Sequence, residues 1–330
     1  MQIQDITALM DSIHARFVIL LCHHNADPDA IGAAAAFSSL IGRLRPRIRT
    51  QIGAAEGPSR LSKRLLKVLP MKLADNPQIE DAEVIVLLDT NTIQQLGDWA
   101  ERVKASSAPV VVIDHHASHP ETEKLAELTI SDETVSSTCE IVYRFFMDMN
   151  VRLTETEAKA LFLGIAFDTR HFILANSTTL KTVADLIDAG VNAKETLQLL
   201  ALPMEESERI ARLKASKRIK LVKIRDHLVA FSHVGAYQAS AARALISLGA
   251  HLAIVAGQRE DRLRISMRAS QEYYKASGVH LGRDLAKPLG EYLGGMGGGH
   301  ALSAGANGAG DLDACFKRCI KILKEKLRST

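Results

Sequence analysis

The sequence predicts an α/β protein in which a mostly parallel sheet carries helices on both faces, followed by a smaller α/β domain with a mixed sheet. In the first half, apolar runs of strand length alternate with segments of helical periodicity, which is typical of a parallel sheet. In the second half, strand-like runs occur in pairs around short charged turns, as in antiparallel hairpins. The length of 330 residues suits about two domains of roughly 150 residues each.

The elements of the first half follow in order along the chain. Continuous apolar runs predict buried strands at 17–23, 83–89 and 109–116. The segment 47–53 is a further candidate strand. An Ala-rich helix is expected over 30–44, and amphipathic helices over 137–149, 154–167 and 178–189. Thr154 and Glu157 form a capping-box pattern, and Gly190 is a helix stop signal.

The second half begins with a polar helical stretch, which predicts a linker over 196–218. It separates a first domain, 1–195, from a second domain, 219–330. In the second domain we expect a hairpin at 220–234, a helix at 239–248 and a second strand pair at 251–269. Another helix at 284–293, a Gly-rich loop at 294–299 and a final helix at 311–328 follow.

The composition excludes several classes of protein. Hydrophobic residues make up 47% and charged residues 24%, as in ordinary globular proteins. No apolar run reaches the roughly 18–20 residues of a membrane span, and four cysteines are too few for a disulfide framework. The N-terminus lacks the pattern of a secretory signal. A cytoplasmic protein without membrane contact is therefore expected.

The net charge of +3 hides a division between the two halves. Residues 1–200 contain 19 basic and 26 acidic residues, and residues 201–330 contain 22 basic and 12 acidic ones. One interpretation is an acidic half that holds cations and a basic half that holds an anion. The alternative is a basic surface without a ligand.

Acidic and histidine side chains follow four of the predicted elements. They are His23 to Asp29, Asp89, Asp114 to His116, and Asp168. A single aspartate at such a place is often only a helix cap or turn former. Four such groups at the carboxyl edge of a parallel sheet would repel one another without a cation. The many oxygen ligands favour Mn²⁺ or Mg²⁺ over zinc or copper.

These segments resemble the motifs of the DHH phosphoesterase superfamily. The first motif is similar to His23-xxx-Asp27-Pro28-Asp29, the second to Asp89, the third to Asp114-His115-His116 and the fourth to Asp168-Thr169. The stretch 297–305, GGGHALSAG, is similar to the Gly-rich motif of the associated C-terminal DHHA1-type domain. The closest resemblance is to the subfamily of oligoribonucleases and 3′-phosphoadenosine 5′-phosphate phosphatases.

The resemblance implies two divalent ions, most commonly Mn²⁺, with Mg²⁺ or Co²⁺ as substitutes. The metal ligands that it implies are His23, Asp27, Asp29, Asp89, His115 and Asp168. Asp89 would bridge the ions, His116 would face the substrate phosphate, and Asp114 would orient a neighbouring histidine. A pair of cations would activate water for attack on phosphorus, so no protein nucleophile is needed.

The second domain is expected to bind the rest of the substrate. The residues predicted to do so are Gly298, Gly299, His300, Ser303, Arg264 and Arg268. Glycine backbone can approach a phosphate closely, and Arg264 and Arg268 would lie on one strand face as a basic strip. Arg259 and Arg262 are predicted to be solvated turn charges.

The resemblance implies a metal-dependent hydrolase of short nucleotide esters: oligoribonucleotides, linear dinucleotides or 3′-phosphoadenosine 5′-phosphate. One alternative is an exonuclease on longer single strands, although aromatic residues, at 5%, are few for base stacking. Another is a non-catalytic sensor of cyclic dinucleotides. An inorganic pyrophosphatase shares the motif order of the first domain but not the Gly-rich motif. No stable binding of duplex DNA is expected, and a homodimer is compatible with the sequence.

Overall fold

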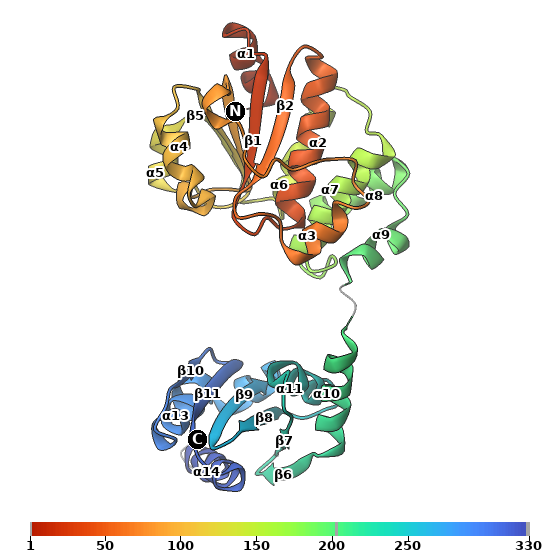
Figure 1. The fold of residues 1–330 in the computed structure, drawn as a ribbon. Coiled ribbons are helices and arrows are strands. Elements are labelled where there is room, and N and C mark those ends of the chain that lie inside the picture. Colours follow the sequence, from red (N-terminus) through yellow and green to blue (C-terminus); the bar gives the residue numbers. More distant parts are fainter. Residues whose placement is uncertain (1, 202–203, 328–330) are drawn as a thin grey trace. The chain divides into compact units, whose positions relative to one another are not determined.

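The chain folds into two compact units, Met1–Leu202 and Pro203–Thr330, in a computed structural model that describes residues 2–201 and 204–327 (Figure 1). The predicted linker, 196–218, includes residues 202 and 203, which lie outside the described residues. The same holds for residue 1 and residues 328–330 of the two predicted domains. Among the described helices, none combines the length and the apolar character that crossing a membrane requires.

The first unit contains an all-parallel sheet of five strands in the order β2-β1-β3-β4-β5. These strands are β1 (Phe17–Cys22), β2 (Arg49–Ala54), β3 (Val84–Leu88), β4 (Val110–Asp114) and β5 (Ala126–Ser131). The strand order reverses between β1 and β3, since β2 lies on one side of β1 and β3 on the other. In open parallel sheets, ligands bind beyond the carboxyl ends of the strands at such a point.

Helices cover both faces of this sheet, as the sequence predicted. Alternate strand residues pack with α2, α6 and α7 on one face and with α4 and its neighbouring short turns on the other. The helices of the unit are α1 (Ile3–Ser12), α2 (Pro28–Leu44), α3 (Arg60–Leu65), α4 (Trp99–Ala105), α5 (Pro120–Leu125), α6 (Thr138–Asp148), α7 (Glu155–Asp168), α8 (Ser177–Asp188) and α9 (Ala193–Leu200), with 3₁₀ turns η1 (Ile79–Asp81) and η2 (Ile93–Leu96).

Five helices and strands of the first unit were not predicted from the sequence: α1, α3, α4, α5 and β5. The start of α9 also lies before the predicted helical linker. Three of the five, α3, α5 and β5, are only six residues long. The strand β5 lies at the sheet edge, and Ile130 is its only buried residue. Its sequence has no continuous apolar run from which a strand could be predicted. Short elements of this kind are stabilised by tertiary packing rather than by a local pattern.

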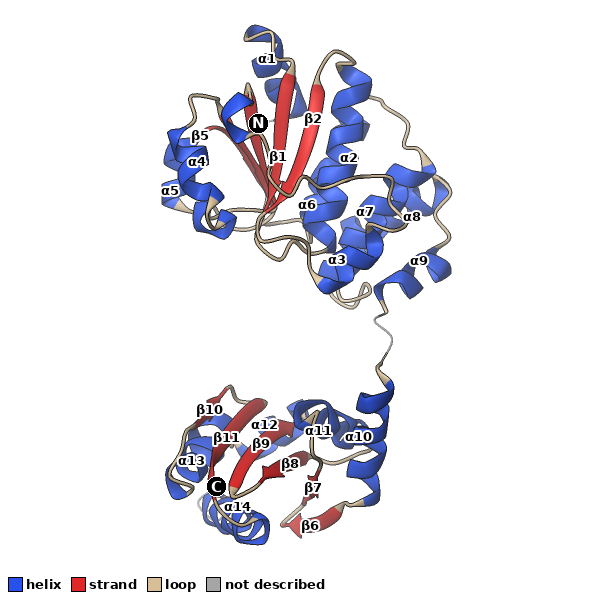
Figure 2. Cartoon of the chain, viewed as in Figure 1, coloured by secondary structure: helices blue, strands red, loops and turns tan. Residues whose placement is uncertain are grey.

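The second unit contains a mixed sheet of six strands in the order β10-β11-β9-β8-β7-β6, and only β7 and β8 are parallel (Figure 2). The strands are β6 (Lys220–Ile224), β7 (His227–His233), β8 (Leu252–Arg259), β9 (Arg262–Ala269), β10 (Gly297–Gly299) and β11 (Ser303–Ala309). This mixed sheet confirms the predicted fold class of the second half.

The helices of the second unit pack on both faces of its sheet. One face packs with α12, α13, α14 and a π-helical turn, and the other carries α10 and α11 over β7 and β8. These elements are α10 (Glu206–Lys217), α11 (Gln238–Ser247), α12 (Gln271–Ser277), the π-helical turn η3 (Leu281–Ala286), α13 (Lys287–Tyr292) and α14 (Leu312–Lys326).

The prediction of a Gly-rich loop is wrong in its details. Gly297–Gly299 form strand β10, which pairs with β11. A Cβ atom at Gly297 would come within 1.8 Å of the main-chain oxygen of Ala286, and Gly299 has a φ of +135°. The glycines therefore serve close backbone packing as well as an open surface. Like β11, the helix α12 had not been predicted from the sequence.

Candidate functional site

Four elements of the first unit end at the carboxyl edge of its sheet, and each brings predicted site residues there. His23 follows β1, Asp89 follows β3, and Asp114 ends β4 directly before His115. Asp168 is the last residue of α7. The three strand ends meet because the carboxyl ends of parallel strands share one edge. Helix α7 brings Asp168, about 145 residues after His23, to the same place.

The six residues predicted as metal ligands form overlapping groups. His23, Asp27 and Asp89 place ligand atoms within 4.8 Å of one another, and so do Asp29, His115 and Asp168. Asp89, His115 and His116 form a third such group, which connects the first two. The structure therefore brings all six side chains to one centre.

Asp89 lies between the two groups and is buried. Its Oδ2 atom is 3.6 Å from His23 Nε2, and its Oδ1 atom is 3.6 Å from His115 Nε2. The hydroxyl of Thr138 donates a hydrogen bond to Oδ1 at 3.1 Å. The backbone of Asp89 is left-handed, with a φ of 53°, a conformation that costs energy for residues other than glycine and often occurs at functional sites.

The carboxylates of Asp27 and Asp29 also cap helices. Asp27 accepts hydrogen bonds from the main-chain N–H groups of Asp29 and Ala30 at the start of α2. Asp29 is fully buried and accepts from the N–H groups of Thr138 and Cys139, at 2.7 and 3.0 Å, at the start of α6. Both interpretations of these residues, helix capping and metal binding, are compatible with the structure because a carboxylate has several lone pairs.

Asp114 and His116 form a tight pair beside the two groups. Asp114 Oδ1 is 2.8 Å from His116 Nδ1 and also accepts a hydrogen bond from the His116 main-chain N–H at 2.8 Å. Asp114 is buried, whereas 55% of the His116 side chain is exposed. The carboxylate orients the imidazole so that Nδ1 faces Asp114 and Nε2 is left for another partner.

The pKa values reflect the crowding of carboxylates. Burial, together with the charges of Asp168 and Asp89, raises the pKa of Asp29. Burial and the other carboxylates likewise raise the pKa of Asp168. For His23, burial opposes the charged form, but Asp27 and Asp89 outweigh it and raise the pKa to about 10. Without a metal, protons partly neutralise a centre that cations would neutralise better.

The donor set fits divalent metal ions. Within the described part of the chain, the buried Nε2 atom of His115 has no hydrogen-bond partner, although it lies 3.3 Å from Asp168 Oδ2 and 3.6 Å from Asp89 Oδ1. A buried polar atom without a hydrogen bond is costly. A nitrogen that points between carboxylate oxygens is arranged as a metal ligand would be, and the mixture of four carboxylates with two imidazoles suits Mn²⁺ or Mg²⁺.

Residues 17–165 match the family model described as the N-terminal domain of the DHH family. An uncharacterised protein of Methanocaldococcus jannaschii is 32% identical to this chain over 331 residues, which cover 96% of this chain and 98% of that protein. The chain belongs to the DHH family. Members of the DHH family are metal-dependent phosphoesterases and related hydrolases.

Two further DHH relatives match about half of the chain. One is the bifunctional oligoribonuclease and PAP phosphatase NrnA of Bacillus subtilis, 27% identical over 56% of each chain. The other is a probable manganese-dependent inorganic pyrophosphatase of Lactococcus lactis, 28% identical over 54% of this chain and 57% of that protein. This chain thus matches little more than half the length of either relative.

A solved structure shares the fold of this chain over nearly its whole length. An exopolyphosphatase-related protein from Bacteroides fragilis superposes with a TM-score of 0.62, covering 99% of this chain and 96% of that one. The identity is 19%, so this similarity concerns the fold alone.

Four predicted substrate residues of this DHH protein share one sheet face of the second unit: Gly298, Ser303, Arg264 and Arg268. Gly299 has the register of the other face, because it pairs with Ala304, which lies opposite the buried Met267. Arg268 on β9 is directly opposite Ser303 on β11, and Ser303 O accepts a hydrogen bond from the His300 N–H at 2.7 Å. A Cβ atom at Gly298 would meet nothing within 4 Å, so the surface there is open. Arg268, Ser303 and Gly298 form one end of the face.

Arg264 lies four residues before Arg268 on the same strand, hence on the same face but about 14 Å away. The half-buried guanidinium of Arg268 donates only to the main-chain oxygen of Met267 among the described residues. Burial, and then the charge of Arg243 on α11, lowers the pKa of Arg268. Arg243 gave no signal in the sequence, because its position beside Arg268 depends on how α11 packs on the sheet.

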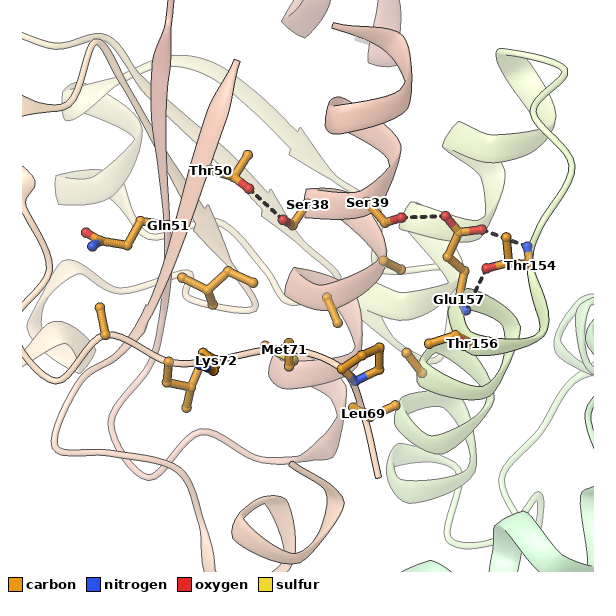
Figure 3. Close-up of a pocket in the computed structure, with 17 residues that line it drawn as sticks. Ser38, Ser39, Thr50, Gln51, Leu69, Met71, Lys72, Thr154, Thr156 and Glu157 are labelled. Carbon is orange, nitrogen blue, oxygen red and sulfur yellow. Dashed lines mark hydrogen bonds between the residues drawn. The ribbon is translucent and has the colours of Figure 1, made fainter. Parts of the chain in front are cut away.

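A cavity of about 600 Å³ lies elsewhere in the first unit, between α2, β2, the start of α7 and residues 69–74 (Figure 3). Several of its polar side chains are paired with one another or with neighbouring residues. Ser38 is hydrogen-bonded to Thr50, and Glu157 accepts from Ser39 and Arg43. None of the predicted site residues lines this cavity. The centre built around Asp89, and not this hollow, carries the chemistry expected of a DHH protein.

Proposed function

We propose that this chain is a two-metal phosphoesterase that hydrolyses short nucleotide esters with Mn²⁺. The single observation that carries the proposal is the convergence of three groups of carboxylates and imidazoles at one sheet edge. The substrates proposed are oligoribonucleotides, linear dinucleotides and 3′-phosphoadenosine 5′-phosphate. The names of the Bacillus subtilis and Lactococcus lactis relatives support the substrate class and the metal, respectively.

In this proposal His23, Asp27 and Asp89 would hold one cation, and Asp29, His115 and Asp168 the other, with Asp89 shared. Divalent cations held there would polarise a phosphate and lower the pKa of a water molecule. His116, oriented by Asp114, would donate a hydrogen bond from Nε2 to a phosphate oxygen. A protonated His116 imidazole, held in place by Asp114, would stabilise the negative charge that builds up on that oxygen.

The residues of the second unit would bind the remainder of the substrate. Arg268 has guanidinium N–H groups to spare for a phosphate, and Ser303 and His300 lie beside it. Arginine suits this role because its planar fork of donors matches phosphate geometry. The partner is therefore proposed to be a short nucleotide rather than duplex DNA or a membrane.

An activity panel in Mn²⁺ tests the proposal. It compares 3′-phosphoadenosine 5′-phosphate, linear and cyclic di-adenylate, short RNA, short DNA and pyrophosphate. We expect hydrolysis of the short linear nucleotides and its loss in the double variant Asp114→Ala/His115→Ala. The double variant Asp148→Ala/Asp188→Ala, which alters two exposed acidic residues, is the matched control.

Three results would contradict the proposal. Retained hydrolysis in a folded Asp114→Ala/His115→Ala protein would remove the centre from the mechanism. Cleavage of pyrophosphate alone would favour a pyrophosphatase. Tight binding of a cyclic dinucleotide without turnover would favour a sensor.

A further inference from the structure

The second unit contains a large cavity at the end of the sheet where β8 turns into β9. Its volume is about 860 Å³. It is lined by that turn, the start of α11, residues 294–296 and the end of β11. Three arginines, Arg259, Arg262 and Arg264, line it, and none of the described lining residues is acidic. A hollow of this size accommodates part of a substantial ligand, and its charge selects an anion.

The positive charges of the three arginines are not balanced by acidic side chains among the described residues that line the cavity. Arg259 and Arg262 lie directly opposite each other in the β8–β9 register, and Arg264 follows on the same face. Within the described part of the chain, no hydrogen bond or ion pair of their side chains is found. Glu260 and Asp261 lie in the same turn but do not line the cavity. Like charges placed opposite each other destabilise a sheet, so a bound anion would relieve this arrangement.

These arginines extend the basic face that begins at Arg268. The residues Leu263, Ile265 and Met267 of β9 are buried in the core, while Arg262, Arg264, Ser266 and Arg268 alternate with them on the other face. Alternate residues of a strand are about 7 Å apart, so the face runs for about 20 Å from Arg268 to Arg262. The spacing of successive phosphates in an extended single strand is comparable to the distance of about 7 Å between alternate residues of a β-strand.

The rest of the lining suits a nucleic acid chain. Gly235 and Gly294 each leave open space where a Cβ atom would lie, so a ligand can approach the backbone. Tyr237 contributes an aromatic ring whose hydroxyl is tied down by hydrogen bonds to Ser207 and Glu205. A base can stack on such a ring whatever its identity, and arginines can follow the phosphates.

We propose that this cavity is a distal subsite for single-stranded oligonucleotides, reached by a strand whose near end is held at Arg268. The inference rests on the proposed function for the nucleotide held at Arg268. It assigns Arg259 and Arg262 to phosphate binding, in place of the solvated turn charges expected from the sequence. Affinity should rise from a dinucleotide to about five nucleotides and then level off, because the basic face is about 20 Å long.

Binding without catalysis tests this subsite. Fluorescently labelled RNAs, a dinucleotide, a pentanucleotide and a decanucleotide, are titrated with the full chain in EDTA. We expect the pentanucleotide to bind about tenfold more tightly than the dinucleotide, since charge-assisted contacts are the stronger class of hydrogen bond. In the double variant Arg259→Gln/Arg262→Gln, the difference in affinity between the pentanucleotide and the dinucleotide should largely disappear. The slope of log binding constant against log salt concentration for the pentanucleotide should become less steep by about 1.4, because two phosphate contacts are lost.

The matched control is Lys317→Gln/Lys321→Gln. It removes the same charge from exposed positions of α14, which packs on the opposite face of the sheet. This control should keep the wild-type ratio. An equal loss in both double variants would show a nonspecific charge effect and overturn the proposal. Competition by inorganic tripolyphosphate as effective as that by the pentanucleotide would overturn the assignment to an oligonucleotide.

The outcomes separate this inference from the proposed function. Length-dependent binding that Arg259→Gln/Arg262→Gln abolishes, in a protein that hydrolyses no nucleotide in Mn²⁺, would support the subsite and contradict the enzyme. Hydrolysis of dinucleotides by a protein whose affinity does not depend on length would support the enzyme and contradict the subsite.

Discussion

The two units of this chain hold charge in contrasting ways. In the first unit, carboxylates and imidazoles are buried at a sheet edge and held by main-chain N–H groups and by one another. In the second unit, arginines lie on a sheet face among glycines and small residues, with few partners of their own. The first arrangement positions ligand atoms rigidly, and the second leaves a surface on which a flexible anion can settle.

This contrast shows how the two kinds of site differ in what they require of a fold. A metal centre requires atoms placed within a few tenths of an ångström, and the candidate centre has its side chains at the ends of buried strands, with a left-handed backbone at Asp89. Recognition of a phosphate chain requires charge at regular intervals, which one exposed face of a strand supplies.

The largest effect should come from the centre of the first unit. Replacement of Asp89 by alanine removes the carboxylate that lies 3.6 Å from His23, His115 and His116. We expect kcat/KM to fall on the order of 10³-fold or more, since metal stabilisation contributes several kcal/mol and each 1.36 kcal/mol is tenfold. Steady-state kinetics in Mn²⁺ measure it, with Asp188→Ala as the control. A loss below tenfold would place the reaction elsewhere.

A smaller effect, and one on binding, is expected at the second unit. Arg268→Ala should raise KM for a short nucleotide about 10- to 100-fold with less change in kcat, because a hydrogen bond to a charged group contributes about 1.5–3 kcal/mol. Lys321→Ala, on the opposite side of the sheet, is the control. A fall in kcat with KM unchanged would mean that Arg268 acts on the reacting phosphate. It would contradict the assignment of substrate binding, rather than catalysis, to the second unit.

Asp114 tests whether positioning matters in the first unit. Asp114→Ala should lower kcat about 10- to 100-fold, as is typical when the carboxylate behind a functional histidine is removed. Asp114→Asn keeps an oxygen that can accept from the His116 N–H groups and should restore part of the rate. Equal losses in the two variants, at unchanged thermal stability, would argue for a role of the negative charge itself.

The smallest effect concerns stability away from both sites. Burial opposes the ionisation of Glu157, but hydrogen bonds from Ser39 and Thr154 outweigh it and lower its pKa below the ordinary value. The charged form therefore stabilises the first unit above pH of about 4.3, and this contribution is lost as the pH falls through the lowered pKa. Glu157→Gln should cost about 1 kcal/mol at neutral pH and less in acid.

Thermal unfolding at several pH values measures this difference. The variant should lower the stability of the first unit while the second unit, which does not contain Glu157, is unaffected. A difference between wild type and variant that grew in acid would show that the pKa of Glu157 is raised rather than lowered.

The sequence predicted the centre of the first unit better than the surface of the second. Residues such as Asp89 and His115 follow long apolar runs, so their place at one sheet edge follows from parallel topology. Thr138 and Cys139, which bind Asp29, were not predicted because their contact with α2 spans more than 100 residues and depends on how α6 packs.

In the second unit, the alternation in β9 was sufficient to place Arg264 and Arg268 on one face. It could not reveal that Arg259 and Arg262 border a hollow, because residues 294–296 and the start of α11 complete it. Gly297 and Gly299 suggested a loop, since a glycine run has no side chains from which pairing could be predicted.

The structural contacts of Asp29 bear on how relatives of this chain should be compared. Its carboxylate connects α2 to the first turn of α6, so a relative without activity would still have a structural reason to keep an aspartate there. The Nε2 atom of His115, by contrast, makes no hydrogen bond among the described residues. The residue at the position of His115 should therefore indicate better than the one at Asp29 whether a distant member of the family has kept catalytic activity.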